Sequence, residues 1–240
     1  MQDAAVQHAA DGGWPPERFR TTATGFVVRE MSAVHHREAA YGEAMTVTTQ
    51  VADHRRDVLM RRETRITGVM SATADWVHIG PTGAPLRAGP DLISAFPVDP
   101  TAPPAPAIPE PGPPGRPLPD LVFSPWWTEM DPQSHTNHPR YVDWADEALS
   151  RAVHALGLDP VGLLPLAERV RFRAGARAVD TVTVSGSWAG RTTVEGRPGI
   201  CCQFRARRAG PTGPEVVADM FIVRGHIDPA VLDALSAGAG

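Results

Sequence analysis

A proline-rich segment divides the chain. Residues 97–119 contain 11 of the 25 prolines. Proline fixes the backbone angle φ and lacks an N–H donor, so this segment is predicted to form neither a helix nor a central strand. An extended, semi-rigid linker is the expected structure. It separates residues 1–96 from residues 120–240, and 240 residues suit two small domains.

The second half carries one strong helix signal. Asn137 and His138 lead into it, and Pro139 suits a first helical turn. Gly157 is expected to end it. The apolar residues that recur at helical spacing are Tyr141, Trp144, Ala145, Ala148, Leu149, Ala152 and Leu156.

Strand signals flank this helix. A candidate strand, LVFSPWWTE, precedes it, so the adjacent Trp126 and Trp127 are predicted to face opposite sides of a sheet. Four more candidates follow, and a turn at GPTGP joins the last two: AERVRFRAG, AVDTVTVSGSW, GICCQFRARRA and EVVADMFIVRG.

The first half repeats this order of elements. A helix over residues 1–10 is expected to end at Gly12 and Gly13, and a polar loop follows. Four strand candidates come next, at residues 25–34, 43–53, 57–67 and 68–80, with Met45, Val47, Thr49 and Val51 alternating on one face. Each half therefore predicts a helix packed against a curved antiparallel sheet, an α+β fold.

Composition narrows the function classes. The formal charge of −4 argues against a general nucleic-acid binder. The two cysteines are adjacent, no cluster has zinc spacing, and we expect neither a metal nor a cofactor. No apolar stretch approaches the roughly 20 residues that span a membrane, and the N-terminus does not resemble a signal peptide. We expect a cytoplasmic protein without a membrane partner.

The loop before the second helix concentrates reactive groups. Asp131 could act as a base or a nucleophile, and His135 could move a proton because its ordinary pKa lies near ~6.5. Gln133 offers a donor and an acceptor for water or a carbonyl. The helix start adds N–H groups from neighbours such as His138 or Arg140. The alternative interpretation is a set of ordinary capping residues.

The stretch DPQSHTNHPRYVDW resembles the helix entry of hotdog-fold thioesterases, and most closely that of the acyl-ACP thioesterases, which carry two hotdog repeats in one chain. Their active-site loop reads Asp-x-Asn-x-His, here Asp131, Gln133 and His135. Asn137 follows this triplet. His138 stands where the family has a second asparagine, and Tyr141 and Trp144 match the family's tyrosine and tryptophan. In the first half, YGEAMTVTTQV resembles a strand start of the family and SATADWVHI a closing strand.

This resemblance implies a tandem hotdog fold whose first repeat is shortened at its N-terminus. It also implies a thioesterase acting on acyl carrier protein or CoA thioesters, with Asp131, Gln133 and His135 as catalytic residues. Asn137, His138 and Tyr141 would bind substrate. The plant enzymes add a glutamate four residues before an aspartate; if Asp180 matches that aspartate, the glutamate position is Ala176.

Three alternatives concern function and partners. A hotdog hydratase or dehydratase uses a similar Asp and His loop, and the missing glutamate favours a non-catalytic acyl-binding protein. Arg205, Arg207 and Arg208 form either a solvated face or a dock for CoA phosphates or an acidic carrier protein. The two repeats are expected to pack as a pseudo-dimer, and a homodimer of whole chains stays open.

Overall fold

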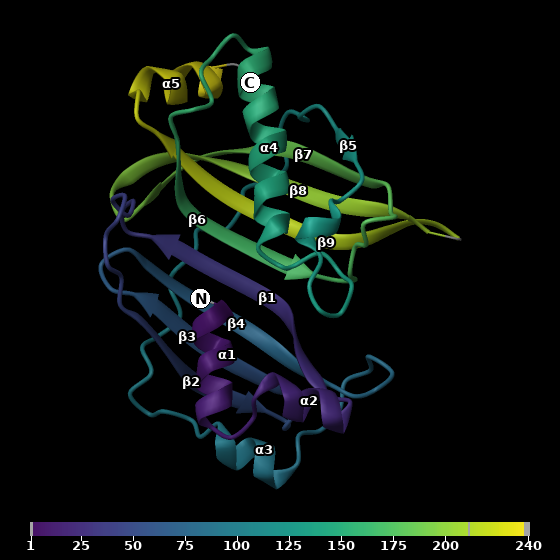
Figure 1. The fold of residues 1–240 in the computed structure, drawn as a ribbon. Coiled ribbons are helices and arrows are strands. Elements are labelled where there is room, and N and C mark those ends of the chain that lie inside the picture. The colour runs from purple at the N-terminus through teal and green to yellow at the C-terminus, as the bar shows by residue number, and fades with distance from the viewer. Residues whose placement is uncertain (1, 211, 238–240) are drawn as a thin grey trace. The chain divides into compact units, whose positions relative to one another are not determined.

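The computed structural model describes residues 2–210 and 212–237, and divides the chain into two compact units between Ala107 and Ile108. Each unit combines helices with an antiparallel sheet (Figure 1). This confirms the α+β class. Among the described residues, every helix is too short or too polar to cross a lipid bilayer.

The first unit holds a four-stranded sheet in the order β2-β3-β4-β1, in which all neighbours are antiparallel. Three short helices accompany it. The elements are α1 (Gln2–Asp11), α2 (Pro16–Thr22), β1 (Gly25–His35), β2 (Val47–Arg55), β3 (Leu59–Ile66), β4 (Met70–Ile79) and α3 (Pro90–Ala95). Its helix-side core is small and is formed by Trp14, Val51, Met60, Leu92 and Phe96.

The second unit holds a five-stranded antiparallel sheet in the order β6-β9-β8-β7-β5. The elements are β5 (Leu121–Phe123), the 3-10 helix η1 (Trp127–Glu129), α4 (Arg140–Ala155), β6 (Leu163–Phe172), β7 (Val182–Val194), β8 (Arg197–Gly210), β9 (Gly213–His226) and α5 (Pro229–Ala237). The 16-residue helix α4 lies across one face of this sheet (Figure 1).

Helix α4 fits the predicted apolar stripe except at its C-terminal end. Six of the seven predicted residues are buried, but Leu156 is 40% exposed and Val153 is fully buried in its place. The reason is that α4 ends at Ala155, and Gly157 follows with φ of +75°. Leu156 therefore lies in the turn and not on the helical face.

Two strand predictions were wrong in detail. Strand β5 stops at Phe123, so Trp126 and Trp127 do not alternate across a sheet; both are exposed, at 64% and 75%. Strand β2 begins only at Val47, and Tyr41 in the preceding loop is fully exposed. On its predicted apolar face only Val51 is buried.

The proline-rich segment is extended, and each end of it binds a different unit. Gln50 donates from Nε2 to Asp99 at 2.6 Å in the first unit. In the second unit, Gln203 donates from Nε2 to the carbonyl of Gly112 at 2.7 Å, and the Gly115 amide donates to the carbonyl of Trp188 at 2.6 Å. We call residues 110–115 the strap, because they lie over the sheet of the second unit.

Candidate active site

Asp131 organises the loop that leads into α4. Its Oδ1 accepts the backbone N–H groups of Gln133 at 2.8 Å and of His135 at 3.1 Å. Its own N–H donates to the carbonyl of His135 at 2.7 Å, and its carbonyl accepts the N–H of Ser134, which has φ of +62°. No hydrogen bond among the described residues uses Oδ2. One carboxylate oxygen therefore holds the loop while the other is free to react.

The loop is tied to the segment after β6 through Ala176. The backbone N–H and the hydroxyl of Thr136 both donate to the carbonyl of Ala176, at 2.7 and 3.1 Å. The N–H of Ala176 donates in turn to the hydroxyl of Tyr141 at 3.1 Å. One peptide segment thus fixes both the loop and the first turn of α4.

His135 lies against a glycine. A Cβ built on Gly175 would come within 2.5 Å of the His135 ring, a distance that real Cβ atoms do not show. The half-buried imidazole therefore packs directly on the backbone of residue 175. Because the carbonyl of Gly175 accepts a hydrogen bond from Arg208, this surface is held in place from strand β8.

His138 is a neutral imidazole at neutral pH. Burial lowers its pKa to about 4, although the nearby charge of Asp131 acts in the opposite direction. Its ring meets the Phe172 ring edge-on, with centroids 6.2 Å apart. It can therefore donate or accept a hydrogen bond beside Asp131 but contributes no positive charge there.

Tyr141 lies under the loop and not on its surface. The residue is 2% exposed, and its ring contacts Trp144 and Phe172 at centroid distances of 4.5 and 5.2 Å. Burial raises the pKa of its phenol to about 12, so it stays protonated. Its hydroxyl is engaged by the amide of Ala176.

Gln133 and Asn137 occupy the outer parts of the loop. Gln133 is exposed, and its backbone N–H donates to Oδ1 of Asp131. Asn137 is half-buried; its N–H donates to the carbonyl of Glu129 at 2.8 Å, and its carbonyl accepts the N–H of Arg140 at 3.0 Å. The Arg140 amide is therefore already used inside the chain, and it is not the donor that the sequence suggested.

No family model and no curated protein matches the chain. Solved structures do. A Lactobacillus plantarum protein provisionally assigned as an oleoyl thioesterase has a TM-score of 0.73 at 16% identity, covering 94% of this chain and 85% of that one. The 12:0-ACP thioesterase from Umbellularia californica has a TM-score of 0.70 at 16% identity, covering 94% and 87%. An acyl-ACP thioesterase from Bacteroides thetaiotaomicron has a TM-score of 0.65 at 16% identity, covering 92% and 84%.

The fold is a double hotdog. In this double hotdog, the position predicted to lack the glutamate is closed to solvent. Ala176 is 0% exposed and belongs to the core between α4 and the sheet. Asp180, the next carboxylate on the segment, accepts the N–H of Arg177 at 2.8 Å and lies 3.3 Å from the guanidinium of Arg208. It anchors the segment.

Three positions of this double hotdog were missed in the sequence: Thr136, Gly175 and Arg208. Thr136 is buried, and Gly175 and Arg208 act through contacts across 33 to 40 residues of chain. The only local signal was a glycine between alanines at the end of a strand, in AGA. A glycine in a strand pattern often marks a close approach of another group, and here that group is His135.

Proposed function

We propose that this protein is a thioesterase that hydrolyses an acyl thioester of acyl carrier protein or CoA in the cytoplasm. The observation that carries the proposal is the Asp131 carboxylate: one oxygen holds the loop and the other makes no hydrogen bond among the described residues. The likeness to structures named as acyl-ACP thioesterases supports it. Asp131, His135 and Gln133 carry the chemistry, and Asn137 and His138 form the substrate side of the site. Tyr141, which the sequence placed with them, supports that side from beneath the loop.

Two routes for Asp131 conserve atoms and charge. As a general base, Oδ2 takes a proton from water while the water oxygen attacks the thioester carbonyl. The C–S bond then breaks, and the proton moves to the departing thiolate. As a nucleophile, Oδ2 attacks the carbonyl itself and expels the thiolate, and water later cleaves the resulting anhydride. In both routes the products are a carboxylic acid and a thiol.

The histidines have different roles in this proposal. His135, held against Gly175, orients the water or passes the proton to the thiolate. His138, neutral because partial burial lowers its pKa, donates a hydrogen bond toward the carbonyl without pairing with Asp131 as a cation. Gln133, exposed at the tip of the loop, closes over the bound thioester. Tyr141 positions the loop through Ala176.

The test compares two aspartate-to-asparagine changes near the start of α4. Asp131→Asn keeps an oxygen for the two backbone bonds and removes the charge, so we expect loss of thiol release by roughly 100-fold or more across an acyl panel. Asp143→Asn is the control, because Asp143 is exposed and pairs on the surface with Arg140. Full activity in Asp131→Asn would overturn the proposal. Including enoyl thioesters in the panel separates hydrolysis from hydration.

The nucleophile and base routes can be separated by isotope labelling. A nucleophilic Asp131 acquires oxygen-18 from labelled water when the anhydride is cleaved at the aspartyl carbonyl, whereas a base never does. Mass spectrometry of the peptide that contains Asp131, after many turnovers, reads this directly.

A second candidate function is acyl binding without turnover. Its support is Ala176, a buried methyl at the position that the sequence resemblance assigns to the plant enzymes' glutamate if Asp180 matches their aspartate. A protein of this kind would retain a labelled acyl thioester on a filter or column and release no thiol. The same panel therefore decides between the two candidates.

A further inference from the structure

A groove of about 530 Å³ lies on the sheet of the second unit. Its lining comes from the strap and from strands β6, β7, β8 and β9. On strand β8, the groove-lining residues Gln203, Arg205 and Arg207 alternate with Cys202 and Ala206, which face the α4 core. The groove is therefore on the sheet face opposite α4. Its volume suits a small ligand, for which sites of roughly 300–1,000 Å³ are usual.

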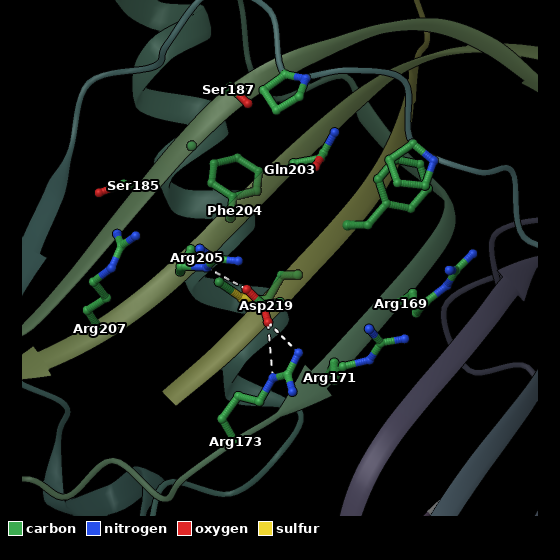
Figure 2. A pocket seen from close by; sticks show the side chains of 15 residues that line it. Arg169, Arg171, Arg173, Ser185, Ser187, Gln203, Phe204, Arg205, Arg207 and Asp219 are labelled. Carbon is green, nitrogen blue, oxygen red and sulfur yellow. Dashed lines mark hydrogen bonds and ion pairs between the residues drawn. The ribbon is translucent and has the colours of Figure 1, made fainter. Parts of the chain in front are cut away.

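The groove carries an excess of positive charge. Asp219 is the one carboxylate among its lining residues, and Glu110 of the strap pairs with Arg169 at 3.2 Å. Five arginines line it (Figure 2): Arg169, Arg171, Arg173, Arg205 and Arg207. Arginine stays charged at any physiological pH. Like charges gathered on one sheet face repel each other and weaken folding. An anionic ligand would offset that cost.

Asp219 is shared and cannot neutralise the cluster. It lies directly opposite Arg171 on one neighbouring strand and Arg205 on the other. Its carboxylate binds the Arg205 guanidinium at 2.6 Å and that of Arg173 at 3.1 Å (Figure 2). Burial opposes ionisation of Asp219, but these two arginines keep its pKa below the ordinary value. Arg207 has no ion pair among the described residues.

The strap walls off the other end of the groove. Gln203 lies opposite Phe221 and Ser187 in register, and it holds the strap by its bond to Gly112. The strap lies close to β7, because a Cβ on Gly112 would be 2.9 Å from the carbonyl oxygen of Ala189. Its Pro111 and Pro114 line the groove together with Phe221. This end therefore combines apolar rings with the polar side chains of Gln203 and Ser187, which Figure 2 shows away from Arg173.

We propose that this groove binds a nucleotide carrying two or more phosphates, with the phosphates on the arginines and the base against the proline and phenylalanine wall. Guanidinium groups match phosphate oxygens in paired hydrogen bonds. Flat bases pack well on apolar rings. The nucleotide is either the phosphorylated end of CoA or a free nucleotide. The proposal does not depend on thioester hydrolysis; only its assignment to CoA rests on the proposed function.

The first experiment measures binding to the full chain by titration calorimetry with CoA, ADP and adenosine. We expect CoA and ADP to bind and adenosine to bind at least 100-fold more weakly. Arg207→Gln should weaken ADP binding about tenfold, whereas Asp219→Asn should tighten it several-fold because it removes the competing carboxylate. Arg151→Gln is the control, since Arg151 is an exposed arginine on α4, paired with Glu147.

Several results would overturn the proposal. One is the absence of ADP and CoA binding at millimolar concentration. Another is that Arg151→Gln weakens ADP binding as much as Arg207→Gln does. Binding of an acidic carrier protein that is lost in Arg207→Gln, without nucleotide binding, would assign the groove to a protein surface instead. Because no thioester is present, these results are obtained whether or not the chain hydrolyses one.

A kinetic comparison then identifies the source of the nucleotide. If the groove binds the end of CoA, Arg207→Gln raises KM about tenfold for an acyl-CoA. It then leaves KM unchanged for the matching acyl-N-acetylcysteamine thioester, which has no nucleotide. If KM is unchanged for both while ADP binding is weakened, the ligand is a free nucleotide. Either outcome supports the groove as a nucleotide site.

Discussion

In the first repeat, Arg62 on β3 is buried beside a neutral group, whereas in the second repeat Arg224 on β9 is buried between two carboxylates. Arg62 donates to Nδ1 of His8, contacts the sulfur of Met60 at 3.7 Å and lies 5.6 Å from the centroid of the Phe96 ring. Burial lowers its pKa to about 10. Arg62 is therefore a buried cation of the first repeat that forms no ion pair with the described residues.

Arg224 is 2% exposed and fully paired. It binds both oxygens of Asp146, at 2.7 and 2.9 Å, and one oxygen of Glu168 at 3.0 Å. Burial alone would lower its pKa, but the two carboxylates raise it. The two repeats therefore differ in how they hold a buried arginine: in the second repeat, which carries the candidate site, it belongs to a network with two carboxylates. A buried charge in such a network is costly when a partner is lost.

Ala176→Glu should have the largest effect. It would place an ionisable group in the core of the second repeat, where Ala176 is 0% exposed. We expect a loss of about 3–5 kcal/mol in the free energy of unfolding, measured by urea titration, because the new carboxylate would lack a buried partner. Ala178→Glu, two residues on at a half-buried position, is the control and should cost much less. Unchanged stability would mean that this core accepts an isolated charge.

Asp146→Ala should rank second. It leaves the buried Arg224 with Glu168 as its one remaining carboxylate; because the Asp146 side chain is itself 41% exposed, we expect a cost of about 2 kcal/mol, below that of a fully buried pair. Glu147→Ala, one residue further along α4, removes an exposed pair with Arg151 and should cost less than about 0.5 kcal/mol. If the two variants unfold at the same temperature, the Arg224 network does not stabilise the second repeat.

Acid should destabilise the second repeat through His138. Burial lowers its folded pKa to about 4, below the ordinary 6.5, so the unfolded chain binds the proton first. The contribution of His138 is full above pH 6.5 and is lost as pH falls toward 4, on the order of 2 kcal/mol. His138→Gln should flatten this part of the curve of unfolding free energy against pH. His154→Gln, at an exposed position of α4, should leave the curve unchanged.

Arg62→Met should have the smallest effect. It replaces an unpaired buried cation with an apolar chain of similar length, so stability should stay within about 1 kcal/mol of the natural protein or rise slightly. Arg224→Met is the counterpart in the second repeat and should be clearly destabilising, because it leaves Asp146 and Glu168 facing each other. Equal losses in the two variants would remove the distinction between the repeats.

The long elements were predictable from the sequence, and the short ones were not. The spacing of apolar residues in the sequence indicates helix α4 and the eight longer strands. Helices α2, α3 and α5 have only seven, six and nine residues, too few for a period to be visible. Each nevertheless begins with a proline, at Pro16, Pro90 and Pro229, a position where proline is favoured. That signal could have found them.

The candidate site was predictable in its residues but not in its contacts. Asp131 and His135 were identified from the loop motif. The use of Oδ1 by two backbone amides, the burial of His138 and the contact of His135 with Gly175 depend on packing between distant segments. The division among the arginines follows the alternation of strand β8: Arg205 and Arg207 line the groove, whereas Arg208 lies on the opposite face and binds Asp180.

The contact between Gly175 and His135 has a consequence for how this protein tolerates mutation. Glycine has no side chain that could take part in catalysis, yet any other residue at position 175 would displace the His135 imidazole. In a library that samples all substitutions, selection for activity should deplete position 175 as strongly as position 131. Selection for folded protein alone should deplete substitutions at position 175 less strongly than selection for activity does. The mutational profile of a catalytic loop would thus extend to a residue that has no side chain.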